Sequence, residues 1–478
     1  MIPPVLHDVP IHLTGVKGTG MAALAEILHD AGAVLSGSDV AEQFFTDTLL
    51  ERIGLTPRVG FDSGHVPPEV ELLVYSSAYG ADNPERAEAQ RRGIPQYSYT
   101  EMLGALSRAR RSLAVSGVHG KTTTTAMIGT IVAATDLPAT VVVGSAVPTF
   151  GGSATLRQGQ ELLVAETCEY RRHFLDFSPD VLIVTSVEAD HLDYYRDYAD
   201  VLEAFISFAR SLPPQGSLIY CADDAGARDV AHRIGEERPD IVRRPYGFSV
   251  RGTGQVSEPI VEAGRQRFTV THADGVVEWT VEVPGRHMVL DAAAAVLGLV
   301  GLVGEPDPVS RGAWQRSLAR FAGTRRRSEL IATVAGVRII DDYAHHPTAI
   351  QTTLSGYRAF WPGRRIVVDF MSHTYSRTTA LLDGFAAAFS DADVVFLNEI
   401  YASAREQNSA AISGQDLANV MAEQHGDVRF VADFTAAADA IAAELQPGDL
   451  FVTMGAGDNF RIAPMVVERL QARQGAQP

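Results

Sequence analysis

Short apolar runs of strand length recur along the chain, and most are followed by a glycine-rich or polar turn and then a stretch of helical length. In the first segment the runs are residues 9–16, 33–36 and 71–75. A helix is expected over 21–31, and Gly32 is placed to end it. Strands that alternate with helices are typical of parallel, doubly wound sheets, so this segment predicts an α/β fold.

The same alternation begins again after the basic stretch at 108–111, where we place the first domain boundary. The expected elements are strands at 113–116, 161–165 and 181–185, helices over 123–134 and from 288 onward, and an antiparallel insert within 247–283 where polarity alternates. A linker around 323–329 closes this second segment. A third α/β segment follows, with strands at 337–342, 366–370, 394–398 and 450–454.

A chain of 478 residues is too long for one core, and about 150 residues per domain predicts three domains. We expect these to span residues 1–110, 111–324 and 325–478, each with a mainly parallel sheet. The outer two would be Rossmann-like, and the central one would resemble a phosphate-loop ATPase.

The net charge of −18 argues against general binding to nucleic acids or anionic membranes, because phosphate backbones require clustered basic residues. The N-terminus shows no signal peptide, and the apolar stretch 292–304 is too short to span a bilayer, so we expect no membrane insertion. Two cysteines cannot form a disulfide framework, which favours the cytoplasm. The sequence leaves open whether the chain forms a homodimer.

The strongest local signal is Gly117-Val-His-Gly120-Lys121-Thr122, which lies between an expected strand and an expected helix. Loop glycines let backbone N–H groups turn toward an anion, and the helix N-terminus adds a favourable dipole. Lys121 could reach the outer phosphates of a nucleotide, and Thr122 could bind Mg²⁺. Val115 interrupts the full Walker spacing, and a plain glycine turn is the alternative. The agreement of strand, loop and helix favours a nucleoside triphosphate site.

Acidic residues follow the next two expected strands. Glu166 ends one strand, and Glu188, Asp190 and His191 follow the other. The carboxyl ends of parallel strands meet at one edge of a sheet, where the phosphate loop also lies. Either group alone would suggest a solvated acidic loop. Beside the loop they predict metal coordination by Glu166 and His191.

The first glycine cluster, Gly15, Gly18 and Gly20, is a weaker signal. With Asp39 after the second strand, it is compatible with a nucleoside diphosphate and its ribose. A dehydrogenase would use the same features, but the glycine order is not the standard one. A separate triphosphate loop favours two nucleotide sites, one for a nucleotide that carries the substrate and one for a nucleotide that is consumed.

Joined in order, these motifs resemble the Mur ligase family along nearly the full length of the chain. The matching segments are GVKGTGM at Gly15, GSD at Gly37, SSA at Ser76 with Asn83-Pro84-Glu85, GVHGKTTTT at Gly117, CEYRRHF at Cys168, EADHLDYY at Glu188, GRHMVLDA at Gly285, RR at Arg326, DDYAHHPT at Asp341, HTYSRT at His373 and GAGD at Gly455. The series is specific, although its individual glycine motifs are not.

The resemblance implies an ATP-dependent ligase of peptidoglycan precursor synthesis. Such an enzyme would add an amino acid, L-alanine in the best match, to the carboxylate of UDP-N-acetylmuramate through an acyl phosphate. It implies a UDP-substrate-binding first domain, an ATP-binding central domain and an amino-acid-binding third domain. ATP and two Mg²⁺ ions would be required.

The resemblance also implies roles for individual residues. The ATP-binding set would be Gly117, His119, Gly120, Lys121, Thr122, Thr123, His287, Arg326 and Asp342. The substrate-binding set would be Gly18, Thr19, Gly20, Ser38, Asp39, Ser76, Ser77, Asn83, Arg172, His373 and Arg377. The catalytic set would be Lys121, Glu166, His191, His345 and Arg377, with Thr122, Glu166 and His191 as metal ligands.

Several positions depart from the family pattern. Lys17 replaces a glycine and could add a cation near the substrate diphosphate, and Ser186 replaces a frequent asparagine. Met288 and Asp291 replace the usual asparagines of the segment that contacts adenine, which puts those contacts in doubt but not the phosphate chemistry. Ser372 and Thr374 also depart, and together these changes suggest a divergent branch.

The amine that attacks an acyl phosphate must be neutral, so a group must accept its proton. His191, His345 and His346 are candidates, and the sequence does not choose among them. Arg377 is expected to pair with the α-carboxylate of the amino acid. The pair His345–His346 lacks an accompanying cysteine or spaced carboxylates, which argues against zinc. Cys168 lacks a base partner and is expected to be a buried structural thiol.

Three other functions remain open at this point. The first is a recycling ligase that adds a peptide to the same sugar nucleotide, which CEYRRHF disfavours because related peptide-adding enzymes tend to be more acidic there. The second is an inactive nucleotide sensor, which Met288 and Asp291 alone support. The third is an NAD-linked oxidoreductase, which leaves the loop at Gly117 unexplained.

Overall fold

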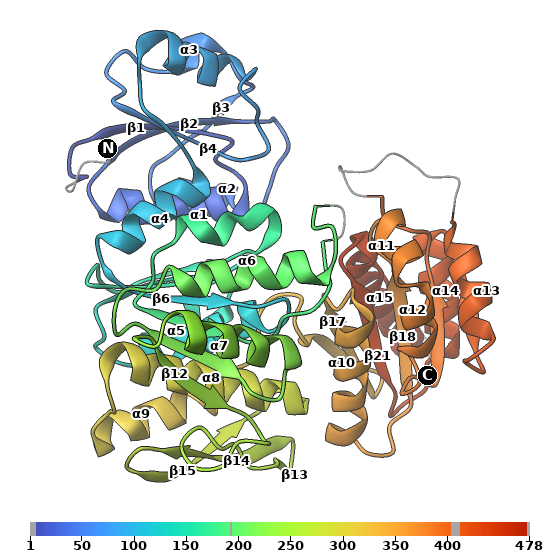
Figure 1. The fold of residues 1–478 in the computed structure, drawn as a ribbon. Coiled ribbons are helices and arrows are strands. Elements are labelled where there is room, and N and C mark those ends of the chain that lie inside the picture. Colours follow the sequence, from blue (N-terminus) through green and yellow to red (C-terminus); the bar gives the residue numbers. More distant parts are fainter. Residues whose placement is uncertain (1–5, 192–193, 403–411, 476–478) are drawn as a thin grey trace.

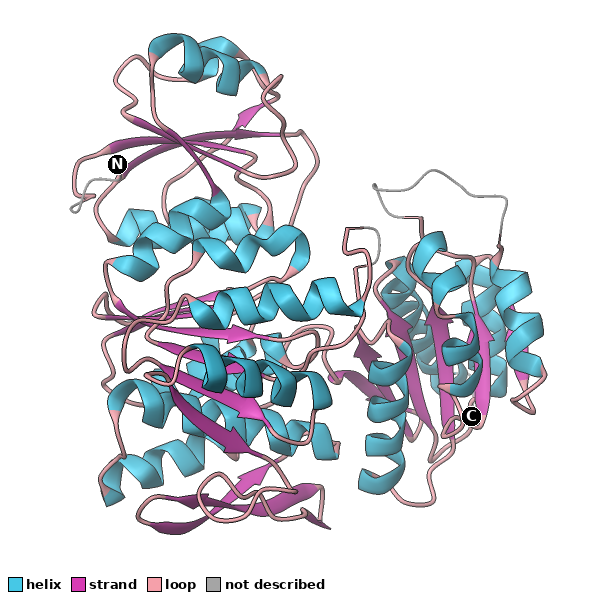
Figure 2. Cartoon of the chain, viewed as in Figure 1, coloured by secondary structure: helices cyan, strands magenta, loops and turns pink. Residues whose placement is uncertain are grey.

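The computed structural model describes residues 6–191, 194–402 and 412–475. Leu192 and Asp193 of the acidic motif lie outside the described residues. Three mainly parallel sheets follow one another along the chain, and helices cover their faces (Figures 1 and 2). The α/β fold with three successive sheets that the sequence predicted is therefore confirmed.

The first sheet has the order β3-β2-β1-β4-β5, and all its strands are parallel. Its elements are β1 (Pro10–Thr14), α1 (Thr19–Asp30), β2 (Val34–Asp39), α2 (Asp47–Arg52), β3 (Arg58–Val59), η1 (Ser63–His65), β4 (Leu72–Tyr75), α3 (Pro84–Arg92), β5 (Gln96–Ser98) and α4 (Tyr99–Arg108). Gly32, at φ +83°, follows α1 as expected, because a left-handed residue there suits glycine.

The central sheet has the order β12-β11-β10-β6-β9-β7-β8, and only β8 is antiparallel to its neighbour. Its elements are β6 (Arg111–Ser116), α5 (Lys121–Ala133), β7 (Ala139–Val142), η2 (Pro148–Phe150), β8 (Thr155–Arg157), β9 (Leu162–Glu166), η3 (Tyr170–Asp176), β10 (Val181–Val184), α6 (Tyr198–Arg210), β11 (Ser217–Cys221), α7 (Ala225–Glu237) and β12 (Val242–Tyr246). This order places β6 between β9 and β10, so the phosphate loop after β6 lies between the two acidic segments.

The expected antiparallel insert is present as a three-stranded sheet of β13 (Ile260–Glu262), β14 (Arg265–His272) and β15 (Gly275–Val281). It lies at the lower end of the central domain in Figure 1, followed by α8 (Arg286–Val303) and α9 (Pro308–Leu318). Helix α8 is long and apolar enough to cross a membrane by length and composition, but 72% of it is buried inside the protein. It packs against α5, β10 and β11 and is a core helix.

The third sheet has the order β16-β17-β21-β18-β19-β20, and only β16 is antiparallel. Its elements are β16 (Glu329–Val334), β17 (Val337–Asp342), α10 (Pro347–Phe360), β18 (Ile366–Met371), α11 (Tyr375–Ala380), α12 (Leu382–Ala387), β19 (Val394–Leu397), α13 (Gly414–Ala422), β20 (Val428–Phe430), α14 (Phe434–Glu444), β21 (Leu450–Gly455), η4 (Asp458–Arg461) and α15 (Ile462–Gly475). In Figure 1 the first domain stacks on the central domain, and the third domain lies beside the central one with α10 toward it.

Candidate active site

The loop between β6 and α5 has a conformation that requires its glycines. Gly117 and Gly120 have φ of +137° and +79°, and a side chain at either position would collide with Thr185 or Asp291 respectively. The end of β10 holds the loop in place, because the Thr185 hydroxyl donates to the His119 carbonyl at 2.5 Å and Ser186 Oγ accepts from the His119 N–H at 2.9 Å. Ser186 therefore supports the loop from the position where an asparagine is frequent.

The Lys121 side chain lies within this loop. Its ammonium donates to the Gly117 carbonyl and lies 2.9 Å from Glu169 Oε2. Desolvation by itself would lower the pKa of Lys121, but the negative charge of Glu169 reverses this effect and the net shift is upward. Lys121 is therefore a cation at neutral pH.

Two of the three expected metal ligands are in direct contact. The Thr122 hydroxyl donates to Glu166 Oε1 at 2.9 Å, and Glu166 Oε2 accepts from the Gly144 N–H at 2.7 Å. The third expected ligand, His191, lies with its Nε2 3.5 Å from Glu169 Oε1, the carboxylate that also binds Lys121. Hydroxyl and carboxylate oxygens are the donors that Mg²⁺ prefers, so Thr122 and Glu166 fit this ion.

Two cavities meet at Glu166. One, of about 310 Å³, runs from the phosphate loop to α8 and α10, and its lining includes Lys121, Thr122, Glu166, His287, Asp291, Arg327, Asp342 and His345. The other, of about 220 Å³, lies between the first and central domains, where Thr19 and Gly20 of α1 face Gly144, Glu166 and Cys168. Glu166 lines both cavities, so a single carboxylate lies where two bound molecules could meet.

Two buried groups in the larger cavity, His287 and Asp291, are neutral at pH 7. Burial lowers the pKa of His287 to about 4 and raises the pKa of Asp291 to about 8. Asp342 accepts from the Ser328 and Ala344 N–H groups, and burial raises its pKa as well. The neutral His287 and Asp291 suit an uncharged heterocycle, whereas Lys121 and the helix N-terminus suit phosphates.

Arg377 of the third domain reaches the central domain. Its Nη2 donates to Asp190 Oδ1 at 2.8 Å, and its Nη1 lies 3.2 Å from His373 Nδ1. Although burial raises the pKa of Asp190, the Arg377 guanidinium outweighs that effect and holds this pKa far below its usual range. His345 lies near the same pair, and burial holds its pKa well below the usual value, so its imidazole is neutral.

Comparison with known proteins bears directly on this arrangement. Three family models match successive parts of the chain, namely the catalytic domain of the Mur ligase family over residues 10–111, the Mur ligase middle domain over 115–299 and the glutamate ligase domain of Mur ligases over 326–457. The chain is also 46% identical to UDP-N-acetylmuramate–L-alanine ligase of Treponema pallidum over 97% of both proteins. The chain belongs to the Mur ligase family.

Other Mur ligases match over similar lengths. The UDP-N-acetylmuramate–L-alanine ligase of Desulfitobacterium hafniense is 41% identical over 96% of this chain and 99% of its own. Among solved structures, UDP-N-acetylmuramate-alanine ligase from Thermotoga maritima has a TM-score of 0.77 at 24% identity and covers 97% of this chain and 99% of its own. A murein peptide ligase from Psychrobacter arcticus has a TM-score of 0.65 at 22% identity over 97% and 98% of the two chains. These two structural matches establish the shared fold.

In this Mur ligase, Arg326 was expected to contact ATP, but it is not among the residues that line the larger cavity. Its guanidinium pairs with Asp341 at 3.1 Å and donates to the Gly455 carbonyl at 2.8 Å. The neighbouring Arg327 lines the cavity instead. Arg326 and Ser328 both have positive φ, and this turn decides which arginine of the run faces the nucleotide side.

Only some of the expected substrate-binding residues line the smaller cavity. Thr19 and Gly20 line the smaller cavity, with Gly18 as the residue before α1, whereas Ser38, Asp39, Ser76, Ser77 and Asn83 lie outside its lining. Asn83 caps α3, and Ser38 donates to the buried Glu85 at 2.6 Å, so both have structural contacts. Arg172 pairs with Asp200 at 2.6 Å, and Lys17 pairs with Asp47 at 3.3 Å. Each of these two cations is therefore paired with a carboxylate of the protein itself.

Two features of the site were missed from the sequence. Glu169 joins Lys121 to His191, but the sequence offered only its position in an acidic segment. Cys168 was expected to be buried and is exposed, because it lines the smaller cavity. The residues around Cys168 alternate between buried and more exposed positions just after β9. The amino-acid composition of this segment does not predict which of them is exposed.

Proposed function

We propose that this Mur ligase uses ATP to join L-alanine to the carboxylate of UDP-N-acetylmuramate. The relatives of that name, at 46% and 41% identity over nearly the full chain, support this substrate assignment. We also propose a cytoplasmic location, supported by only two cysteines, both of them free. The domain limits 1–110, 111–324 and 325–478 are proposed to separate UDP-substrate, ATP and amino-acid binding.

The observation that carries the proposal is the position of Glu166 between the two cavities. ATP would occupy the larger cavity with its phosphates on Gly117–Thr122. The diphosphate of the sugar nucleotide would lie at the N-terminus of α1 in the smaller cavity, where free N–H groups favour an anion. The γ-phosphate and the sugar carboxylate would then meet beside Glu166.

A carboxylate is a poor acyl donor, because its oxygen leaves badly and its charge repels a nucleophile. In the first step a carboxylate oxygen would attack the γ-phosphorus, and the bond to the β-phosphate oxygen would break to release ADP. Lys121 would stabilise the negative charge that crowds this centre. Mg²⁺ held by Thr122 and Glu166, with a second ion at His191, would supply further charge neutralisation.

In the second step the amine nitrogen would attack the acyl carbon, and inorganic phosphate would leave. Arg377 would exchange Asp190 for the α-carboxylate of alanine, to which its two N–H groups can bind in parallel. His345 would accept the proton of the amine, since its imidazole is neutral and lies near Arg377. Closure of the third domain would exclude water from the acyl phosphate.

The test is phosphate release from ATP in the presence of UDP-N-acetylmuramate and a panel of L-alanine, glycine, L-serine and a muropeptide-type tripeptide. The proposal expects release to depend on the sugar nucleotide and to be fastest with L-alanine. A preference for the tripeptide would identify a peptide-adding ligase instead. The absence of turnover with every acceptor, in a sample that binds ATP, would refute the proposal and favour a nucleotide sensor.

A further inference from the structure

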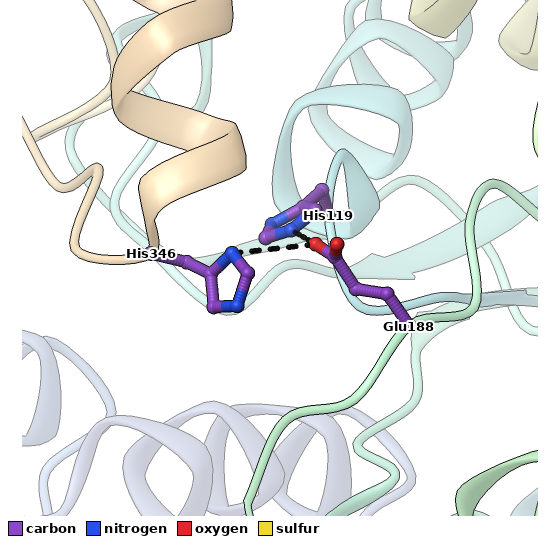
Figure 3. A group of neighbouring side chains, drawn as sticks. All are labelled: His119, Glu188 and His346. Carbon is purple, nitrogen blue, oxygen red and sulfur yellow. Dashed lines mark hydrogen bonds and ion pairs between the residues drawn. The ribbon is translucent and has the colours of Figure 1, made fainter. Parts of the chain in front are cut away.

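Three side chains far apart in sequence converge at the boundary between the central and third domains. His119 belongs to the phosphate loop, Glu188 follows β10, and His346 immediately precedes α10 (Figure 3). One nitrogen or carboxylate oxygen from each lies within 4.8 Å of the others, which is close enough to share one ion. The sequence had argued against zinc at His345 and His346, because no cysteine or spaced carboxylate set accompanies them.

The contacts inside this cluster centre on the carboxylate. Glu188 Oε1 contacts His119 Nε2 and lies 3.5 Å from His346 Nδ1, and Figure 3 shows both rings directed at it. Its other oxygen accepts from the Thr348 hydroxyl at 3.1 Å, which fixes the orientation of the carboxylate. A ligand carboxylate that is itself held by a hydrogen bond is typical of metal centres.

His346 is poorly satisfied by the protein. It is only 5% exposed, and within the described part of the chain its Nε2 has no hydrogen-bond partner. Its Nδ1 accepts only a long bond of 3.4 Å from the Thr348 N–H. The nitrogen that faces Glu188 is Nδ1, and its single long hydrogen bond leaves it available to an ion at this cluster.

We propose that His119, Glu188 and His346 form a Zn²⁺ site that joins the phosphate loop to the third domain. Two imidazoles and one carboxylate are a donor set typical of zinc with one open position, whereas Thr122 and Glu166 offer the oxygen donors that Mg²⁺ prefers. The site is therefore separate from the ligands proposed for Mg²⁺, namely Thr122, Glu166 and His191. His119 and Glu188 are each about 30% exposed at the side chain, so an ion can enter from solvent. A bound ion would hold the two domains together at this contact.

The site is tested by titrating Zn²⁺ into the full chain against a chromogenic chelator, with excess Mg²⁺ present to fill the oxygen sites. Glu188→Gln keeps the size of the side chain and removes its charge, and His346→Asn keeps a residue able to cap α10. Glu166→Gln is the matched control at the proposed Mg²⁺ site. Circular dichroism of each variant establishes that it is folded.

The proposal expects one Zn²⁺ per chain in the wild type and in Glu166→Gln. Glu188→Gln and His346→Asn each remove a direct ligand and should raise the Kd for Zn²⁺ by at least ~100-fold. This is more than the loss expected when a residue that only hydrogen-bonds to a ligand is removed. Co²⁺ bound in place of Zn²⁺ should give visible absorption bands that the two variants lose. Equal zinc affinity in His346→Asn and wild type, loss only in Glu166→Gln, or no zinc binding at all would each overturn the proposal.

Discussion

The carboxyl group of Asp291 lies buried behind the phosphate loop. It is 7% exposed, it accepts from the Thr124 hydroxyl at 3.3 Å, and it leaves no room for a side chain at Gly120. Burial raises its pKa to about 8, so Asp291 is protonated at neutral pH and offers a neutral donor and acceptor. In that form it resembles an asparagine, the residue that the family pattern led us to expect at this position.

Replacing this residue in Asp291→Asn should stabilise the protein increasingly as pH rises from about 4 to about 8. The unfolded chain releases the proton above its ordinary pKa, whereas the folded chain keeps it until about pH 8, so rising pH favours unfolding of the wild type. The slope is at most about 1.4 kcal/mol per pH unit for one proton. Between pH 5 and pH 7 the variant should therefore gain about 2–3 kcal/mol over the wild type. For a domain of this size that corresponds to roughly 5–10 °C in Tm.

The measurement is thermal unfolding of both proteins at several pH values, together with Mg·ATP affinity. An ionised Asp291 would place negative charge behind the phosphates, so ATP affinity of the wild type should fall above about pH 8 and that of Asp291→Asn should not. Asp369→Asn is the control, because burial raises that carboxyl pKa to about 7 in the third domain. Asp369→Asn should change the pH dependence of the Tm but not the pH dependence of ATP affinity. Parallel Tm curves for wild type and Asp291→Asn would refute the reasoning.

Three further substitutions test the proposed chemistry. Lys121→Met should lower kcat by about 10²–10³, which is the usual loss when one preorganised charge is removed. The control Arg196→Met, at an exposed side chain, should leave kcat unchanged. Equal kcat for Lys121→Met and wild type would contradict the proposed role of Lys121 in stabilising the transferred phosphoryl group. Arg377→Lys should raise KM for L-alanine by about 10–100-fold because the parallel hydrogen bonds are lost, whereas Arg172→Lys should leave it unchanged. Glu166→Gln should raise the Mg²⁺ concentration for half-maximal rate by about tenfold or more, and an unchanged Mg²⁺ dependence would exclude it as a ligand.

Much of the fold and the phosphate loop could be predicted because their signals are local. A strand, a glycine turn and a helix follow one another within about twenty residues at Gly117, and the left-handed φ of Gly120 is a property of that turn alone. The contact between Thr122 and Glu166 followed from a simple rule, since neighbouring parallel strands end at one edge.

The remaining features depend on tertiary packing. Nothing local distinguishes Arg326 from Arg327, and the choice is made by a turn with positive φ that packs against β21. The cluster of His119, Glu188 and His346 joins residues more than two hundred positions apart through the contact of two domains. Hydrophobic periodicity specifies which face of an element is buried, but not which polar side chains meet across a domain boundary.

The central claim is that the γ-phosphoryl group of ATP is transferred to the sugar carboxylate before the amide forms. It is tested most directly with UDP-N-acetylmuramate carrying oxygen-18 in its carboxylate, followed by mass analysis of the phosphate released during ligation. The proposed mechanism predicts one labelled oxygen in each inorganic phosphate and ADP as the other product. Unlabelled phosphate, or label found in AMP with release of pyrophosphate, would contradict it.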